Sequence, residues 1–171
     1  STDNIVGISG CGFNSKILSI RIDNDVNGAL TGAYDGVIYA ADHGAFIINN
    51  SWGSYNYSRL AQDVVNYASI NKGALVICAV GNGPFTGPNV GMGTEQRFYP
   101  AAYENVFSVG SLIEGDTVKA SSNYGYWVEV FAPGENMLTT AANGNYGING
   151  GTSMAAPVLA GVAALVKSEF P

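Results

Sequence analysis

The sequence predicts an α/β domain with a mainly parallel sheet, because short apolar runs alternate along the chain with segments of helical spacing. The chain has 171 residues, enough for one domain with a core of its own. Charged residues make up 12% of it and glycine occupies 23 positions. This composition excludes a disordered or coiled-coil chain, since both are rich in charge. Without a repeat or a linker-like change in composition, residues 1–171 are predicted to form one unit.

The part of the chain up to Val80 predicts a β-α-β-α-β order. Apolar residues alternate along the first strand and follow helical spacing in the helices, while the third strand is continuously apolar, as in a buried parallel strand. The expected elements are a strand at Lys16–Ile22, a helix at Leu30–Asp42, a strand at Ala45–Asn49, a helix at Leu60–Ala68 and a strand at Ala74–Val80. Gly44 and Gly73 follow the two helices, as glycine commonly does.

The second half begins with a loop rich in glycine and proline and ends with a helix. Between them we expect short strands at Val106–Gly110, Trp127–Phe131 and Met137–Thr140. The helix, Ser153–Glu169, is rich in small residues, so its backbone can approach neighbouring elements closely. We therefore expect it to run through the core, with Pro157 tolerated because first-turn amides lack a helical acceptor.

Charge and hydropathy exclude two classes of partner. Lys and Arg number 7 against 13 Asp and Glu, for a net charge of −6, and the basic residues form no cluster. Such a chain repels phosphates, so we expect no nucleic-acid partner. We also expect no membrane partner. The most apolar stretch, Met154–Val166, is interrupted by Pro157 and Gly161 and is shorter than the roughly 20 residues that a bilayer requires.

Three short segments carry candidate functional residues. Ser153, in the run GTSMA, lies where a loop becomes the last helix, and the amides of a helix N-terminus suit a hydroxyl that attacks a carbonyl group. Asn82, in GNG, follows a buried strand at the edge where α/β sites assemble. Ser51–Gly53, in NSWG, offers backbone groups to an extended peptide. Each has a structural alternative: an N-cap serine, an asparagine in a left-handed turn, and an ordinary strand exit.

Taken together, these segments resemble the subtilisin-like serine proteases, the subtilase family. GTSMAAPVLAGVAALV is similar to the run around the family's nucleophile, AVGNG to the strand end carrying its oxyanion asparagine, and INNSWGS to its substrate-binding strand. YPAAYENVFSVGS and VFAPGENMLTT resemble later structural segments. The resemblance covers residues 5–170 in the family's order. It implies a three-layer subtilisin-like α/β fold.

The resemblance also implies a role for each candidate residue. Ser153 would be the nucleophile, and Asn82 with the backbone N–H of Ser153 would form the oxyanion hole. The walls of the primary specificity pocket would be Ser51, Trp52 and Gly53 on one side and Ala79, Val80 and Gly81 on the other. Gly28 would flank the far side of a bound peptide. Phe98 occupies a place that the family often gives to a small residue at the pocket floor, so we expect a preference for small substrate side chains.

No candidate base for a serine nucleophile is evident in the sequence. Acyl transfer needs a group that takes the serine proton and a carboxylate that orients it. The only histidine, His43, falls in the last turn of the first predicted helix, a position that is not catalytic in the family. The family's aspartate strand and histidine helix lie upstream of the segment that residues 1–10 resemble. We therefore expect residues 1–171 to be a partial subtilase catalytic domain that lacks the N-terminal strands and the catalytic histidine helix and is inactive in isolation.

The family resemblance sets further expectations for partners. In the family, the aspartate strand lies between the strands that Lys16–Ile22 and Ala45–Asn49 resemble, and we expect the N-terminal part of the same domain, or a second copy of this chain, to fill that place. The substrate would be a polypeptide and the location extracellular or periplasmic. No cofactor is expected to be required. Asn4 falls where the family often has a calcium loop, so a structural calcium ion is weighed against a solvated polar turn.

Other classes of function fit the sequence less well. An α/β-hydrolase needs glycine two positions after its nucleophile and a histidine further on, whereas here Ala155 stands at that position and no histidine follows Ser153. Cys11 and His43 lie in no cysteine-protease signature. The alternative from another class is a non-catalytic subtilase-like domain that binds peptides or partner proteins.

Overall fold

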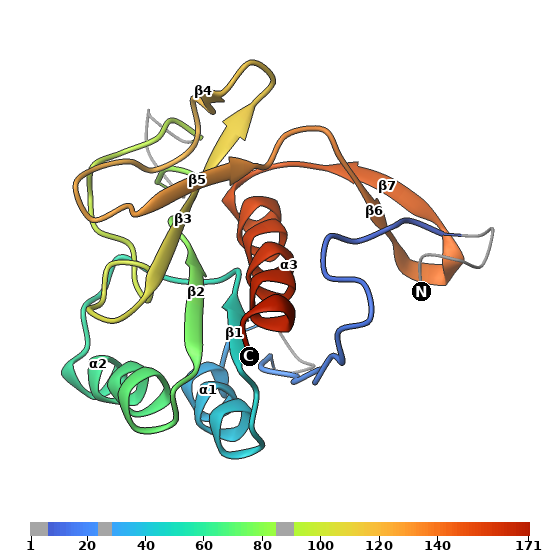
Figure 1. Ribbon diagram of the computed structural model, residues 1–171. Coiled ribbons are helices and arrows are strands. Elements are labelled where there is room, and N and C mark those ends of the chain that lie inside the picture. The colour runs from blue at the N-terminus through green and yellow to red at the C-terminus, as the bar shows by residue number, and fades with distance from the viewer. Residues whose placement is uncertain (1–6, 24–28, 85–90) are drawn as a thin grey trace.

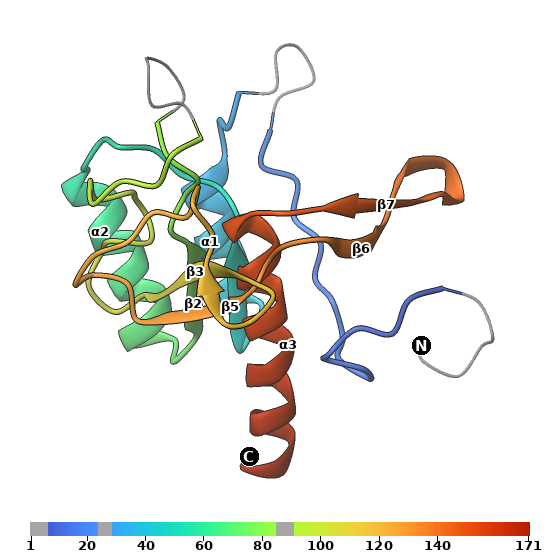
Figure 2. The same ribbon diagram turned by 90° about the horizontal axis from the view of Figure 1, so that it is seen from above.

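A mainly parallel sheet separates two layers of helices (Figures 1 and 2). The computed structural model describes residues 7–23, 29–84 and 91–171. Within them, β1, β2, β3 and β5 run parallel in that order, and β4 pairs antiparallel with β3. The strands are β1 (Ile47–Asn50), β2 (Leu75–Ala79), β3 (Phe107–Ile113), β4 (Thr117–Val118) and β5 (Val130–Pro133). This arrangement confirms the predicted α/β class.

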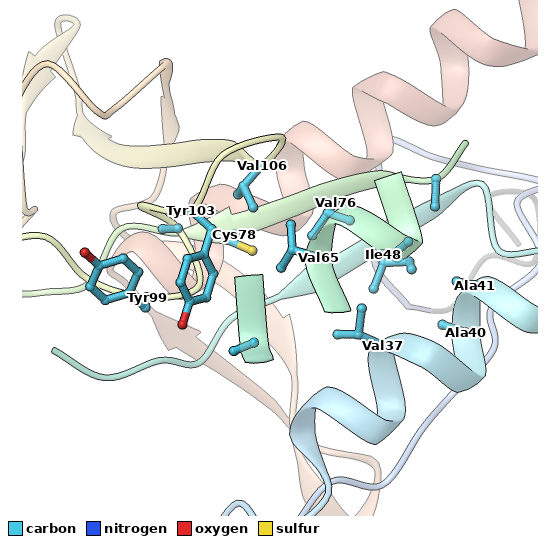
Figure 3. Packing of buried hydrophobic residues seen from close by; sticks show 14 of the residues in the cluster. Val37, Ala40, Ala41, Ile48, Val65, Val76, Cys78, Tyr99, Tyr103 and Val106 are labelled. Atoms are coloured by element: carbon cyan, nitrogen blue, oxygen red, sulfur yellow. The ribbon is translucent and has the colours of Figure 1, made fainter. Parts of the chain in front are cut away.

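Helices cover both faces of the sheet. On one face lie α1 (Ala33–Asp42) and α2 (Arg59–Asn66), the latter continued by a π-helical turn at Tyr67–Asn71, and on the other lies α3 (Thr152–Glu169), as Figure 2 shows. A hydrophobic core lies on each face of the sheet, and the side chains of β2 point alternately into one and the other. Val76 and Cys78 pack toward α1 and α2 (Figure 3), and Ile77 and Ala79 pack toward α3. Burial on both faces explains why this strand is continuously apolar.

A two-stranded hairpin extends beside this three-layer body (Figure 1). It consists of β6 (Met137–Thr140) and β7 (Tyr146–Asn149), which pair antiparallel around a 3-10 turn at Ala142–Gly144. The predicted strand at Met137–Thr140 is confirmed, and β7 was not predicted. The hairpin leads directly into α3, so it carries the chain to the N-terminus of that helix.

The prediction of a strand at Lys16–Ile22 is wrong. The segment is extended but forms no ladder; instead Ile20 and Ile22 lie against Gly36 of α1, where a Cβ would be 2.9 Å from Cγ2 of Ile22. A strand requires a neighbour that accepts and donates its backbone hydrogen bonds. Among the described residues the segment makes only one backbone bond of this kind, from the N–H of Gly32 to the carbonyl of Ile22, and no ladder follows from it. Its alternation therefore reflects packing of two isoleucines on a helix.

The expectation that the last helix runs through the core holds only for its first part. Thr152, Ala155 and Ala156 are fully buried against the sheet. Further along, Val162 is 43% exposed and Val166 is 55% exposed. The described residues supply no layer that covers this side of α3, so the small residues near its start carry the close packing.

Candidate active site

The three candidate segments meet at one edge of the sheet. The strands β1 and β2 are parallel and in register, with Asn50 opposite Cys78, so the residues that follow them leave the sheet side by side. The N-terminus of α3 lies at the same place. Together these segments line a pocket of about 240 Å³, bounded by Leu30, Ser51, Trp52, Gly53, Ala79, Gly81, Asn82, Phe98, Thr152 and Ser153.

Ser153 is the second residue of α3 and not its N-cap. The N-cap is Gly151, which makes no side-chain cap and has φ of 115°. A Cβ at Gly151 would lie 2.9 Å from Oδ1 of Asn82, so both the backbone angle and the space call for glycine there. The structural alternative that we weighed for Ser153 is therefore wrong. Its hydroxyl donates to the carbonyl oxygen of Ser51 at 3.3 Å, directly after the end of β1.

Pro157 ties the first turn of α3 to the end of β1. In a helix the carbonyl of Ser153 would accept from the amide of residue 157, but proline has no N–H. The hydroxyl of Ser51 supplies the missing donor, at 3.0 Å from that carbonyl oxygen. Asn49 in turn donates to the Ser51 hydroxyl through Nδ2 at 3.2 Å, which leaves the hydroxyl proton for Ser153. Pro157 is thus accommodated by a contact outside the helix, and not by lying in its first turn as we expected.

Asn82 is bound to the N-terminus of α3. Its Oδ1 accepts from the backbone N–H of Thr152 at 2.9 Å, and the N–H of Gly81 donates to Oγ1 of Thr152 at 3.2 Å. With Oδ1 engaged, Nδ2 is the donor that Asn82 can offer to a ligand. The backbone N–H of Ser153 has no acceptor among the described residues and belongs to the set of amides that a helix N-terminus leaves open. Two donors are therefore available beside the Ser153 hydroxyl.

Phe98 closes one side of the pocket. A Cβ at Gly53 would lie 2.5 Å from Cε1 of Phe98, and one at Gly81 would lie 3.0 Å from Cδ1, so the ring lies against both pocket walls. Phe98 is only 4% exposed. Of the other wall residues, Val80 points away into the core on the α1 and α2 face. Gly28 lies outside the described residues.

A second hollow of about 370 Å³ adjoins the pocket, because both are lined by Leu30, Trp52 and Gly53. Tyr34 and Tyr99 complete much of its wall. Burial, with a hydrogen bond to Tyr103, raises the pKa of the Tyr34 hydroxyl, so this phenol stays uncharged. The extended segment Ser51–Gly53 therefore runs between two hollows, one lined by the candidate nucleophile and one lined by aromatic rings.

His43 does not approach Ser153. It follows α1 and precedes β1, whereas Ser51 follows β1, so the strand separates the histidine from the pocket. Its Nδ1 lies 2.8 Å from the carbonyl oxygen of Tyr39 and its ring stacks on the Tyr39 ring at 3.8 Å. This agrees with the sequence-based conclusion that His43 is not the base.

The remaining candidates for other chemistry carry no site. Burial raises the pKa of the Cys78 thiol to about 12, so it is not a nucleophile near neutral pH. Cys11 is exposed and unpaired with Cys78. Asn4, the predicted calcium ligand, lies outside the described residues. Within the described ranges no three His, Cys, Asp or Glu side chains cluster as metal ligands would.

The family assignment follows from the whole sequence. The profile described as "Subtilase family" matches residues 1–171. The chain belongs to the subtilase family. A thermophilic serine proteinase from Bacillus sp. (strain AK1) is 41% identical over 169 residues, which are 98% of this chain and 40% of that protein. Thermitase from Thermoactinomyces vulgaris is 40% identical over 169 residues, 98% of this chain and 57% of its own length.

Solved structures agree with this assignment. A cold-adapted subtilisin-like serine proteinase superimposes with a TM-score of 0.81 at 30% identity, over 94% of this chain and 56% of that one. This subtilase chain thus spans about half the length of the proteins it matches. A further relative is the major intracellular serine protease of Bacillus subtilis (strain 168), so family membership does not decide the compartment. None of the described helices has the length and apolar character needed to cross a bilayer.

Sequence reasoning missed three residues at this site, of which Leu30 lines the pocket and was expected only as the start of the first helix. Thr152 stands inside the recognised motif, and its position beside Ser153 was the available signal. Asn123 is distant in sequence, in a segment without a recognisable motif, yet its side chain reaches the turn that carries Asn82.

Proposed function

We propose that this chain forms the nucleophile-bearing and peptide-binding part of a serine endopeptidase domain that cleaves peptide bonds through an acyl-enzyme. The observation that carries the proposal is the meeting of Ser153 and Asn82 at one pocket, beside the extended segment Ser51–Gly53. The polypeptide substrate would add to that segment as a further strand. Its side chains would alternate between the pocket and the aromatic hollow, since successive residues of a strand point in opposite directions.

In this proposal Ser153 attacks the scissile carbonyl and two donors stabilise the resulting oxyanion. The donors are Nδ2 of Asn82 and the backbone N–H of Ser153, which stand ready before the charge develops. In the full-length protein, Asn82→Ala should lower kcat about 10² to 10³-fold, the loss known for one such donor in subtilisin, a member of this family. Ser153→Ala in the same protein should remove the acyl-enzyme altogether.

The isolated chain should be inactive, because its single histidine lies at the far end of β1. We infer that the base and its carboxylate come from polypeptide outside this chain. A fluorophosphonate probe should therefore fail to label the isolated chain rapidly, with Ser153→Ala defining the background. Fast stoichiometric modification of Ser153 would contradict the proposal.

A non-catalytic, peptide-binding subtilase-like domain is the second candidate, favoured by the lack of a base beside Ser153 among the described residues. The two candidates differ in the full-length protein. An Asp segment and a His-Gly-Thr segment encoded upstream of Ser1, with probe labelling at Ser153, would support the protease. Their absence from the gene, with peptide binding retained, would support the binding domain.

Further properties belong to the same proposal. If the Phe98 ring, which lies beside Gly53 and Gly81, is the floor of the pocket, the full-length enzyme should prefer small side chains there. Profiling against peptide libraries that revealed a strong preference for large aromatic residues would contradict this. The protein would be exported, would need no cofactor for the reaction, and would use calcium near Asn4 only as a structural ion. Nucleic acid and membranes are not expected partners.

A further inference from the structure

The turn that carries Asn82 is held by the side chain of Asn123. Nδ2 of Asn123 donates to the carbonyl oxygen of Val80 at 2.8 Å, and its Oδ1 accepts from the N–H of Gly83 at 2.9 Å. One amide group thus binds the backbone on both sides of Asn82. The asparagine is completely buried, so these bonds do not compete with water.

The remaining hydrogen-bonding capacity of Asn123 is also used. Its Oδ1 accepts a second bond, from the N–H of Thr94 at 3.1 Å, and Nδ2 lies 3.5 Å from the Tyr55 hydroxyl. Its backbone N–H donates to the carbonyl of Gly81 at 3.0 Å. These contacts lie beyond the end of β2 at Ala79, where the hydrogen-bond ladder of the strand has ended. Gly81 and Gly83 both have positive φ, so the turn cannot be held by extension of the strand.

We propose that Asn123 is the positioning residue of the Gly81–Gly83 turn and that it thereby holds Asn82 against the first turn of α3. The proposal rests on the proposed role of Asn82 in the oxyanion hole. It goes further by assigning the rigidity of that group to a residue that touches neither substrate nor the Ser153 hydroxyl.

The first test measures amide exchange in the full 171-residue chain. Asn123→Ala should speed exchange of the Gly83 and Thr94 amides by about tenfold or more and shift the side-chain NH₂ resonances of Asn82, while amides within β2 and β3 keep their protection. Ser122→Ala is the matched control. It removes a buried hydroxyl that accepts from the N–H of Ser111 and donates to the backbone carbonyl of Asn123, while the Asn123 side chain keeps its own bonds, so it should leave Gly83 unchanged.

Two results would overturn the proposal. One is a folded Asn123→Ala variant in which Gly83 exchanges at the wild-type rate. The other is a uniform increase in amide exchange across the sheet, which would make Asn123 a general stabiliser.

If Asn123→Ala fails to fold, Asn123→Asp replaces it. Aspartate keeps the oxygen that accepts from Gly83 but loses the donor to Val80, so protection of Gly83 should persist while the Asn82 resonances shift; loss of Gly83 protection would count against the proposal.

A second measurement uses the chemistry of Asn-Gly sequences. In such a pair the glycine nitrogen attacks the asparagine Cγ, a C–N bond forms as ammonia leaves, and water then opens the ring to aspartate or isoaspartate. Because Asn123 engages the Gly83 N–H, Asn82 should deamidate much more slowly than the exposed Asn143, which also precedes a glycine.

Peptide mapping by mass spectrometry after incubation at mildly alkaline pH reports both sites in one sample. Slow reaction at Asn82 and fast reaction at Asn143 support the proposal; equal rates in the folded chain overturn it. In Asn123→Ala the rate at Asn82 should rise toward that at Asn143, and in Ser122→Ala it should not. None of these measurements needs catalysis, so failure of the proposed protease function would leave them interpretable.

Discussion

The contact between Ser51 and Ser153 shows how one proline shapes the site at the level of single residues. Because Pro157 supplies no N–H, the Ser153 carbonyl depends on the Ser51 hydroxyl. Ser51→Ala should therefore cost about 1 kcal/mol of unfolding free energy, the usual net value of such a bond. In a Pro157→Ala background the alanine amide can bond the carbonyl, and the same substitution should cost much less.

A double-mutant cycle measured by urea unfolding tests this dependence. Ser51→Ala and Pro157→Ala should be coupled by about 1 kcal/mol, since both act on one acceptor. Ser54→Ala, directly after the segment Ser51–Gly53, is the control and should show no coupling to Pro157→Ala. Additive effects of Ser51→Ala and Pro157→Ala would mean that the Ser51 hydroxyl does not replace the helical donor.

Motifs at strand and helix ends pointed to residues that the fold brings to one pocket. Ser153, Asn82 and Ser51 each border a strand or helix whose periodicity is visible in the sequence, and parallel strands bring their carboxyl ends together. Asn123 gave no such signal. Its partners Val80 and Gly83 are about 40 positions away, and a buried asparagine is recognised only when its hydrogen bonds are known.

The elements were predicted with different success for a physical reason. Helical spacing and continuous apolar runs report burial, so α1, α2, β2 and α3 were located within a few residues. Alternation at Lys16–Ile22 also indicates that every second residue is buried. It does not tell whether these residues pack as part of a sheet or against a helix. The segment Lys16–Ile22 lies against α1 at Gly36, and the described part of the chain holds no strand that pairs with it.

The close approach of α3 to the segment near Cys11 depends on Gly161. A Cβ there would lie 2.9 Å from Cβ of Cys11 and 2.9 Å from the backbone nitrogen of Gly12. Gly161→Ala should therefore displace this segment and speed tryptic cleavage after Lys16 several-fold. Global stability should change little, because alanine in a helix recovers about 1 kcal/mol over glycine.

Limited proteolysis of the native chain measures that displacement. Val162→Ala changes the neighbouring, partly exposed residue of α3 and should leave the cleavage rate after Lys16 unaltered. An unchanged rate in Gly161→Ala would show that the segment does not depend on close contact with the helix.

The molecule as a whole exposes an apolar face and an open sheet edge together. Val162, Leu165 and Val166 lie on one side of α3, three and four residues apart, and all are more than a third exposed. Among the described residues β1 pairs only with β2, so its other edge is open. Such a face and edge favour association with another polypeptide. We propose that the N-terminal part of the same domain covers them, and a second copy when that part is absent.

Sedimentation of the isolated chain tests the proposal at increasing concentration. The wild-type chain should form dimers or larger species, and Val166→Lys should shift it toward monomer because a charge on the covered face must be desolvated. Leu60→Lys is the control, since Leu60 is an exposed leucine on α2, across the sheet from α3, and its replacement should not change association. A wild-type chain that stays monomeric and unfolds cooperatively would show that the exposed face of α3 needs no partner.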